Sequence, residues 1–233
     1  MNDIKTKNKP LTNFLYSKKR YVYKPSYYLN KAEQERIKIV LKLIGHNKKV
    51  LDIACYDGYV GKKIKNNNNI VFGVDASEEA IRMSTKKGLI TKVSDIEMGL
   101  PYKNNFFNLA FAGEIIEHIV DTDFFIEEIK RVLKKNGELV ITTPNIASLD
   151  RRFMLLFNIN PFLPASFDFP SNALSGHIRF FNNKLLKSFL QHKGFKIVSI
   201  ESDVWSLPKE VYSRLLAQLF PSMGFSIIIK CRL

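Results

Sequence analysis

The sequence contains little cysteine and no long hydrophobic run. Its 233 residues include two cysteines, Cys55 and Cys231, which are too few for a disulfide framework or for a zinc site built from thiolates. No apolar segment approaches the ~20 residues that a membrane-spanning helix needs. The opening stretch, MNDIKTKNKP, also lacks the apolar core of a signal peptide. We therefore expect a cytoplasmic chain with no membrane span.

The first candidate binding loop lacks the glycines of a dinucleotide phosphate loop. It lies in the stretch VLDIACYDGYVG, where a buried strand is followed by a tight turn. A G-x-G-x-x-G loop that began at position 54 would need glycine where the sequence has Ala54, Tyr56 and Tyr59. The loop is also acidic, with Asp52 and Asp57, which suits a ligand that carries a cationic group. These features argue against NAD as the ligand of this loop.

Positive charge is concentrated near the N terminus. Residues 1–49 contain 13 lysines and arginines against three acidic residues, so they carry +10 of the net charge of +14. Aromatic residues alternate with basic ones in residues 1–29, which we interpret as an N-terminal arm. Such an arm can contact phosphates and stack on bases, which makes RNA a candidate partner. The alternative, which we favour, is a solubilising arm whose aromatic residues pack onto the domain.

Short apolar strands alternate with amphipathic helices along most of the chain. The expected strands are Val50–Ala54, Ile70–Val74, Ile90–Val93, Phe107–Ala112, Glu138–Thr143, Phe195–Ile200 and Phe225–Cys231. The expected helices are Asn30–Gly45, Tyr59–Lys65, one capped by Ser77, one from about Asp121 to Gly137, Asn182–His192 and one near Pro208–Phe220. Strands that are apolar along nearly their whole length indicate a parallel sheet with helices on both faces. The sequence therefore predicts an α/β fold.

Residues 144–181 interrupt this alternation. They contain Pro144, Pro161, Pro164 and Pro170 and show no clean periodicity. A connection of this length is typical of a binding loop or a lid. We therefore expect a single domain over residues 30–233, with a lid insertion at about 144–181.

Acidic residues occur where consecutive strands are expected to end. Asp75 follows the second strand, Asp95 the third and Glu114 the fourth. Ligands of such sheets bind beyond the carboxyl ends of the strands. A carboxylate after the second strand, about 20 residues past a tight turn, is the arrangement that hydrogen-bonds ribose hydroxyls. We expect a nucleoside-binding edge here.

These features resemble the class I S-adenosylmethionine-dependent methyltransferases over roughly residues 36–201. VLDIACYDGYVG is similar to their first motif, VFGVDAS to the second-strand acid, VSDIEMGLPYKNNFFNLAFAGEIIEHI to the adenine-side and fourth-strand motifs, and RVLKKNGELVITTPN to the fifth-strand element. The resemblance implies a doubly wound, Rossmann-like sheet of seven strands, mostly parallel with an antiparallel last strand. It implies S-adenosyl-L-methionine as the cofactor, with the turn after Asp52 beside the methionine part, Asp75 on the ribose and Asp95 with Ile96 on the adenine. The cofactor-binding residues that it implies are Asp52, Ala54, Tyr56, Gly58, Asp75, Ala76, Asp95, Ile96 and Ala112.

Ala54 and Tyr56 stand where this family carries glycine. Ala54 fits easily if its φ is negative, and Tyr56 fits if its ring points away from the cofactor or covers it. These two departures leave a non-catalytic protein with the same fold as one alternative to an enzyme.

The sequence also lacks two motifs that would specify the methyl acceptor. There is no [DNS]-P-P-[YF] after the fourth strand, where methyltransferases of exocyclic base amines carry it; the sequence there is AGEI. Neither cysteine suits a nucleophile for pyrimidine C5, because Cys55 lies in the cofactor loop and Cys231 in the last strand. A hydroxyl, an amine or an acidic carbon remains as the acceptor.

The candidate catalytic residues lie in the sequence EIIEH. If the chain turns helical there, Glu114, Glu117 and His118 share one face, and His177 at the end of the lid is a fourth candidate. The set could be a general base with its orienting carboxylate, or ligands for a divalent cation. Two groups of methyltransferases that this pattern resembles, those of quinone biosynthesis and those of small-RNA 3′ ends, use E-x-x-E-H to hold a metal.

We interpret the chain as a methyltransferase that acts on a hydroxyl of a small molecule or glycan. Arg151, Arg152 and Arg179 in the lid would suit an anionic acceptor, although exposed arginines are more often only solvated. Methylation of an RNA ribose 2′-hydroxyl is the alternative, and it is favoured by the basic arm and the two histidines.

Overall fold

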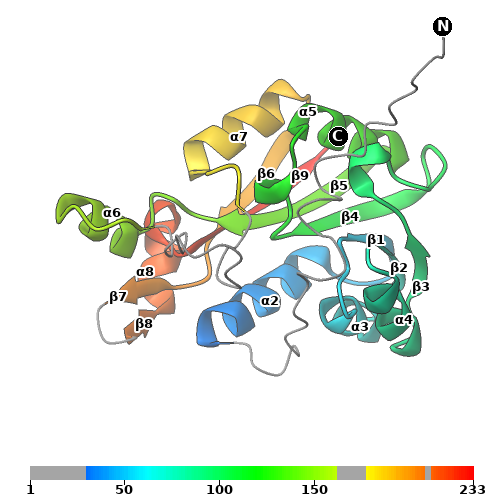
Figure 1. Ribbon diagram of the computed structural model, residues 1–233, viewed down its shortest axis with the longest axis horizontal. Coiled ribbons are helices and arrows are strands. Elements are labelled where there is room, and N and C mark those ends of the chain that lie inside the picture. Colours follow the sequence, from blue (N-terminus) through cyan, green and yellow to red (C-terminus); the bar gives the residue numbers. More distant parts are fainter. Residues whose placement is uncertain (1–29, 162–176, 208–210) are drawn as a thin grey trace, which may run out of the picture.

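The computed structural model describes residues 30–161, 177–207 and 211–233. A seven-stranded sheet lies at its centre, with the strand order β3-β2-β1-β4-β5-β9-β6 (Figure 1). Its strands are β1 (Lys49–Ile53), β2 (Ile70–Asp75), β3 (Ile90–Val93), β4 (Phe107–Gly113), β5 (Leu133–Pro144), β6 (Lys196–Glu201) and β9 (Ser226–Arg232). β9 runs antiparallel to β5 and β6, and the other pairs that involve β1 to β5 are parallel. The predicted fold class is confirmed.

Helices cover both faces of the sheet. The α-helices are α2 (Lys31–Ile44), α3 (Tyr59–Asn66), α4 (Glu78–Lys86), α5 (Thr122–Val132), α6 (Leu149–Leu156), α7 (Asn183–His192) and α8 (Arg214–Leu219). On one face, Ile44 of α2 packs in a cluster with Val140 of β5. On the other face, Leu186 of α7 packs in a cluster with Ile141. Val140 and Ile141 are neighbours on one strand, so each face receives every second side chain.

The helix starts follow from capping residues. Asn30 caps α2 in a reciprocal arrangement, because its side chain accepts from the backbone N–H of Glu33 at 2.9 Å while the Glu33 side chain accepts from the N–H of Asn30 at 2.8 Å. Ser77 caps α4 by accepting from the N–H of Ala80. Both caps confirm the predicted starts.

The end of α5 and the region before α8 differ from the prediction. α5 ends at Val132 and not at Gly137, because the chain already pairs with β4 at Leu133, opposite Phe107. Asn136 then adopts a left-handed φ of 61°, and with Gly137 it forms an irregularity within β5. In the sequence this asparagine-glycine pair looks like the end of a helix. The helix predicted from Pro208 is also too long. α8 starts at Arg214, after a two-stranded sheet of β7 (Trp205–Leu207) and β8 (Val211–Ser213).

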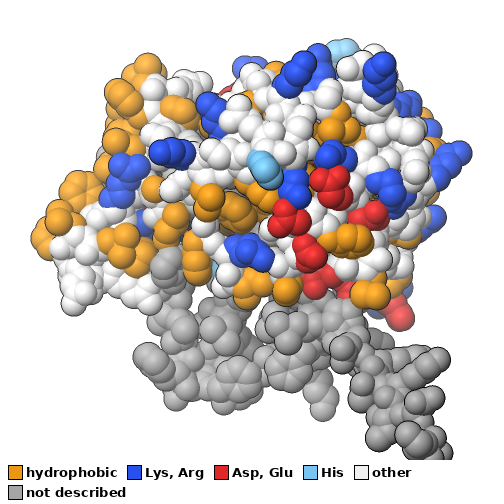
Figure 2. All heavy atoms as spheres, turned by 90° about the horizontal axis from the view of Figure 1, so that it is seen from above, with side chains coloured by type: hydrophobic (Ala, Val, Ile, Leu, Met, Phe, Trp, Pro, Cys, Tyr) orange, Lys and Arg blue, Asp and Glu red, His pale blue; other side chains and the backbone are white. Residues whose placement is uncertain are grey.

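Large apolar side chains gather at the end of the molecule that α6, β7, β8 and α8 form (Figure 2). None of the side chains of α6 is buried. The exposed large apolar residues there are Phe153, Leu155, Leu156, Phe157, Leu215, Leu219 and Phe220. α6 belongs to the predicted lid insertion, and this helix of the insertion is only loosely packed.

The two ends of the predicted insertion are held together. Asn145 pairs with Phe181 in an isolated bridge, and the N–H of Ile146 donates to the carbonyl of Phe181 at 2.9 Å. The predicted arm, residues 1–29, lies outside the described residues, as do residues 162–176 of the insertion. Among the helices of the described ranges, none has the length and apolar character to cross a bilayer.

Candidate functional site

The loop after β1 adopts a conformation that glycine normally provides. Ala54 has a φ of 55°, Tyr56 of 49° and Gly58 of 74°. The condition under which Ala54 would fit easily, a negative φ, is therefore not met, and the backbone has a left-handed geometry at both non-glycine positions. Gly58 is needed for packing, since a Cβ there would lie 2.7 Å from the Cβ of Ser84 on α4.

The Asp75 side chain is hydrogen-bonded both to the loop after β1 and to the loop after β2. Its Oδ2 atom accepts from the N–H of Tyr56 at 3.0 Å, and its Oδ1 atom accepts from the N–H of Ser77 at 2.9 Å. Burial raises the pKa of Asp75, and the hydrogen bonds from the main chain partly oppose this rise. Asp75 thus positions both loops at the edge where it was predicted to bind ribose, and Ala76 beside it is exposed.

Asp52 is a buried carboxylate with one unsatisfied oxygen. The side chain belongs to a residue only 3% exposed, and its Oδ2 atom receives no hydrogen bond within the described part of the chain. Burial first, and then the charges of Asp75 and Asp57, raise its pKa to about 8. Asp57, by contrast, pairs with Lys87 at 2.8 Å. A cation beside Asp52 would lower its pKa again, so Asp52 is the acidic side chain of this loop that is left for a cationic ligand.

The remaining predicted cofactor residues lie at the ends of β3 and β4. Asp95 accepts from the N–H of Glu97 at 3.1 Å and so begins a short 3-10 helix, η2 (Ile96–Met98). Ile96 is buried. Ala112 is fully buried in β4, opposite Ile53 of β1. The parallel pairing of β1, β2, β3 and β4 places the carboxyl ends of these strands at a common edge of the sheet.

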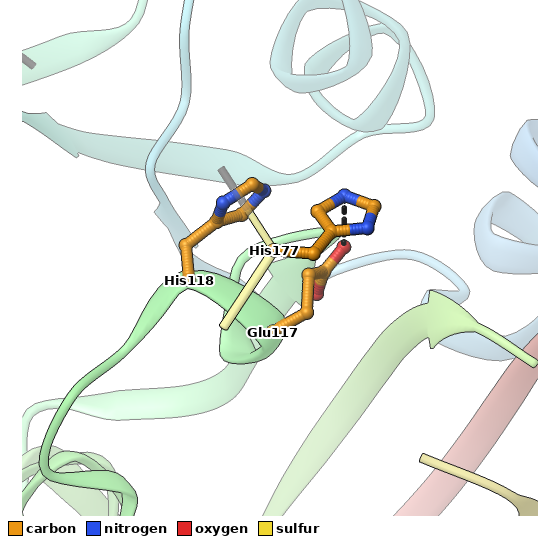
Figure 3. Close-up of side chains that lie close together, drawn as sticks. All are labelled: Glu117, His118 and His177. Atoms are coloured by element: carbon orange, nitrogen blue, oxygen red, sulfur yellow. Dashed lines mark ion pairs between the residues drawn. The ribbon is translucent and has the colours of Figure 1, made fainter. Parts of the chain in front are cut away.

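A second group of side chains meets after β4 and β5 (Figure 3). Glu117 lies in the 3-10 helix η3 (Ile116–His118) and is only 2% exposed. Its Oε2 atom accepts from the Thr143 hydroxyl at 2.9 Å, while its Oε1 atom has no hydrogen-bond partner in the described ranges and lies 3.9 Å from Nε2 of His177. The rings of His118 and His177 are edge-on, with centroids 4.8 Å apart. The structure thus brings together Glu117, His118 and His177, which we call the Glu-His-His cluster.

Main-chain hydrogen bonds fix His177 beside Glu117. The N–H groups of Ile178 and Arg179 both donate to the carbonyl of Glu117, at 2.9 and 3.1 Å. Nε of Arg179 donates to the carbonyl of Ile119 at 2.9 Å. The chain after the insertion is therefore tied directly to η3.

Glu114 does not join the cluster. It has a left-handed φ of 53° and lies before η3, so it does not share a helical face with Glu117 and His118 as predicted. Its Oε2 atom lies 3.1 Å from Nη1 of Arg36 on α2, and its Oε1 atom accepts from the Thr142 hydroxyl at 2.8 Å. The residues that could hold a metal, with ligand atoms all within 4.8 Å of one another, are Glu117, His118 and His177.

Burial favours the neutral forms of both Glu117 and His177. Burial and the charge of Glu114 raise the pKa of Glu117 to about 8. Burial and the charge of His118 lower the pKa of His177 to about 4. At neutral pH the carboxyl is therefore protonated and the imidazole is uncharged. The unpaired Oε1 atom and the nearby imidazole can accept a proton once this carboxyl has ionised.

A small cavity opens beside the cluster. Its volume is about 20 Å³, enough for a water molecule or a small polar group, and its walls include Glu117, His177, Arg151 and Arg179.

Thr143 and Arg36 were not predicted. Thr143 ends a strand at the binding edge, so the rule that found Asp75 could have found it, whereas nothing in the sequence around Arg36 indicates its contact with Glu114.

The donor set of the Glu-His-His cluster fits a divalent cation. Imidazole nitrogen and carboxylate oxygen are usual ligands of such ions. The Oε1 atom of Glu117 has no other partner in the described structure, and Thr143 orients this carboxylate as an outer-shell donor would. Arg151 and Arg179 line the same cavity, and their charges oppose a cation there.

Three comparisons relate the chain to known proteins. A family model described as a methyltransferase domain matches residues 27–200. A ubiquinone biosynthesis O-methyltransferase of Pelagibacter ubique (strain HTCC1062) is 34% identical over 149 residues, which are 61% of this chain and 59% of that protein. The chain thus matches less than two thirds of the length of this relative.

The solved structures that resemble the chain show its fold. An S-adenosylmethionine-dependent methyltransferase of Thermotoga maritima has a TM-score of 0.60 at 20% identity and covers 85% of this chain and 88% of its own. The [4+2]-cyclase SpnF has the same TM-score of 0.60 at 18% identity, with 90% of this chain and 85% of its own covered. Because proteins of different activity share the fold, the activity must be argued from the site.

Proposed function

The chain belongs to the methyltransferase domain family, and from this premise we propose that it uses S-adenosylmethionine to methylate a hydroxyl of a small molecule or glycan. The cofactor supplies an activated methyl group on a sulfonium centre. The protein must bind this cofactor, orient the acceptor in line with the methyl group and accept the proton of the hydroxyl.

The edge formed by the loops after β1, β2 and β3 suits the cofactor. Asp52 offers a buried carboxylate oxygen that no described donor satisfies, which supports a role beside a cationic amino acid moiety. The location of Asp75 at the end of β2 and of Ile96 after β3 supports the roles proposed for them beside the ribose and the adenine. The left-handed backbone at Ala54 and Tyr56 keeps the shape of the loop, which speaks against a degenerate, non-catalytic site.

The Glu-His-His cluster would accept the proton. When the Glu117 carboxyl is ionised and the His177 imidazole is neutral, the pair carries one negative charge. A proton from the acceptor neutralises this charge. Thr143 keeps the carboxylate aimed at His177. The observation that carries this proposal is the buried, unpaired Oε1 atom of Glu117, 3.9 Å from Nε2 of His177.

An assay of methyl transfer tests the proposal. The purified chain would be incubated with S-adenosylmethionine labelled in its methyl group and with paired hydroxylated and deoxygenated acceptors, and the products would be identified by mass spectrometry. We expect label in hydroxylated acceptors only, and loss of transfer in Glu117→Gln. Binding of S-adenosylhomocysteine is measured by calorimetry in parallel. Binding of this product with no transfer to any hydroxyl would contradict O-methylation, and absence of binding would favour a non-catalytic protein.

A divalent cation held by Glu117, His118 and His177 is a second hypothesis for the same cluster. It is supported by three ligand atoms within 4.8 Å of one another. When bound, such an ion would lower the pKa of an acceptor hydroxyl. Calorimetry with Mg²⁺, Mn²⁺ or Zn²⁺ tests it: we expect binding to the wild type and none to His177→Ala, and full activity after chelation would contradict it.

RNA as an acceptor depends on residues 1–29, which lie outside the described structure. Binding to RNA with a steep dependence on salt would support that alternative, and the small-molecule proposal predicts no such binding.

A further inference from the structure

One peptide group lies between the loop after β3 and the chain segment that carries His177, and it is hydrogen-bonded to both. It joins Ile119 to Val120, directly after η3. Its N–H, which belongs to Val120, donates to Oε1 of Glu97 at 2.7 Å. Its carbonyl, which belongs to Ile119, accepts from Nε of Arg179 at 2.9 Å. The C=O and N–H of a trans peptide point in opposite directions, so Glu97 and Arg179 hold this group from opposite sides.

Both side chains that hold this peptide group belong to charged residue types. Hydrogen bonds to a carboxylate or a guanidinium are stronger than those between neutral groups. A carboxylate at one end of the peptide dipole and a guanidinium at the other polarise it in the same sense, so each bond strengthens the other. Arg179 also donates from Nη2 to the carbonyl of Val120. We call Glu97 and Arg179 the peptide clamp.

Glu97 connects the clamp to the loop that is proposed to hold the adenine. It directly follows Ile96 in η2, and its own N–H donates to the Asp95 carboxylate at 3.1 Å. Its side chain then reaches from this loop to Val120. A ligand that orders Asp95 and Ile96 therefore also orders the group that accepts the Val120 N–H.

Arg179 connects the clamp to the Glu-His-His cluster. The N–H groups of Ile178 and Arg179 donate to the carbonyl of Glu117, so Arg179 is bonded to η3 through its main chain and to the peptide after η3 through its side chain. A displacement of the Ile119–Val120 peptide would therefore reach both Glu117 and the segment that follows His177.

We propose that Glu97 and Arg179 are positioning residues of the Glu-His-His cluster, through which occupation of the adenine position fixes the cluster for the acceptor. Their role is exerted through the Ile119–Val120 peptide and not on the reacting atoms. The inference rests on the proposed function, because it assumes that the loop after β3 binds the adenine and that the cluster takes the proton of the acceptor.

Hydrogen exchange of single amides, followed by NMR on the full chain, tests the clamp without turnover. The reporters are the N–H groups of Val120, Ile178 and Arg179. In the cofactor-free protein, we expect Glu97→Ala to speed the exchange of all three roughly 5-fold or more, the lower end of the usual coupling between sites. Glu97→Gln keeps an acceptor oxygen and should restore most of the protection.

Addition of S-adenosylhomocysteine tests the link to the cofactor. At saturation it should slow the exchange of Ile178 and Arg179 roughly 5-fold or more in the wild type and in Glu97→Gln. In Glu97→Ala this effect should be lost, although calorimetry still shows binding of S-adenosylhomocysteine. With an acceptor in hand, Glu97→Ala should lower kcat roughly 10-fold or more and change KM for the cofactor much less, because the acceptor-side groups are misplaced.

Glu79→Ala is the matched control. Glu79 is an exposed carboxylate on α4 that lies 3.8 Å from Arg82, and its loss should leave the three reporters unchanged with and without S-adenosylhomocysteine. The N–H of Val140, in the centre of the sheet, identifies a variant that is destabilised as a whole, since global unfolding exposes every amide.

The outcomes separate the clamp from the enzymatic proposal. Faster exchange at Val120 alone would overturn the positioning role, because the bond to Glu97 would then only close a local turn. An equal response of Glu97→Ala and the wild type to S-adenosylhomocysteine, or a change in KM for the cofactor without a change in kcat, would overturn the link to the adenine position. If the wild type binds no S-adenosylhomocysteine, the proposed function and this link fail together, whereas the cofactor-free exchange of Ile178 and Arg179 still decides the positioning role.

Discussion

Nε2 of His177 lies 3.9 Å from Oε1 of Glu117, and this oxygen receives no hydrogen bond from the described residues. The two residues are 60 positions apart in the sequence, on either side of the insertion, yet the carbonyl of Glu117 accepts the N–H groups of the two residues that follow His177. Main-chain and side-chain contacts therefore bring the same pair together, which supports its proposed role in proton transfer.

The rate of methyl transfer should rise with pH until Glu117 has ionised. Its pKa is raised to about 8, so below this pH most molecules carry the protonated, inactive form. We expect kcat/KM to increase about tenfold per pH unit below pH 8 and then to level off. Initial rates between pH 6 and 9.5 at saturating cofactor measure it. Glu117→Gln should lower the rate by ~100-fold or more and remove this rise; an unchanged profile in that variant would exclude Glu117 as the titrating group.

The free energy of unfolding should fall with pH because of Asp52. Its folded pKa is raised from 3.8 to about 8, so the folded state retains a proton that the unfolded state has lost across that window. The stabilisation is complete below about pH 4 and declines by roughly 1.4 kcal/mol per pH unit up to pH 8. Urea titrations of the cofactor-free protein at pH 6 and 7.5 measure the decline. Asp52→Asn should reduce it, and Glu79→Gln, an exposed change on α4, should not.

Ala54→Gly should stabilise the protein. Ala54 has a φ of 55°, where a Cβ introduces strain that glycine avoids, and we expect a gain of about 0.5–1 kcal/mol in the free energy of unfolding. Ala110→Gly provides the opposite control, because Ala110 is buried in β4 and should lose about as much or more. A destabilised Ala54→Gly variant would mean that the alanine methyl group makes contacts that outweigh the strain.

Asp75→Ala should weaken binding of S-adenosylhomocysteine by ~1–3 kcal/mol, the usual effect of unpaired buried polar groups. Asp75 holds the N–H groups of Tyr56 and Ser77, and under the proposed function it also accepts from the ribose hydroxyls. Asp75→Asn keeps one acceptor oxygen and should lose less. Calorimetry decides, and unchanged affinity in Asp75→Ala would remove this residue from the cofactor site.

Arg36→Met should move the pH profile of activity to higher pH. Arg36 pairs with Glu114 at 3.1 Å, and its charge lowers the pKa of Glu117 whereas that of Glu114 raises it. Without Arg36 the pKa of Glu117 rises further, so more alkaline conditions are needed for the same rate. Lys38→Met is the control, because Lys38 is on the same helix and pairs with Glu35. A profile that does not move would limit Arg36 to a structural role.

The sequence predicted the fold well because the strands are apolar and their ends are marked. Asp75 and Ser77, at the end of β2 and the start of α4, could be placed from local patterns alone. The end of α5 could not, because Leu133 leaves the helix to pair with Phe107 on β4, and this partner is distant in the sequence. The same holds for Glu114, whose left-handed backbone and pairing with Arg36 depend on α2.

The residues of the site that lie directly after strands were predictable from the sequence. Glu117, His118 and His177 were expected to act together, and the structure brings them together. The sign of φ at Ala54 was left open by the sequence, and the structure gives it a positive value because the tight turn constrains the backbone. The contacts of Arg151 with the carbonyl of Asn145 and the ring of Phe225 were not predictable, since Asn145 and Phe225 lie far apart in the sequence.

The pairing of Asn145 with Phe181 provides a fixed base for the segment between them. Since the entropy of closing a loop depends only weakly on its length, such a base tolerates segments of different size and composition. An engineer could exchange the part of this segment that precedes His177 for that of another protein, which would keep the Glu-His-His cluster and, under the proposed function, alter which compounds are recognised.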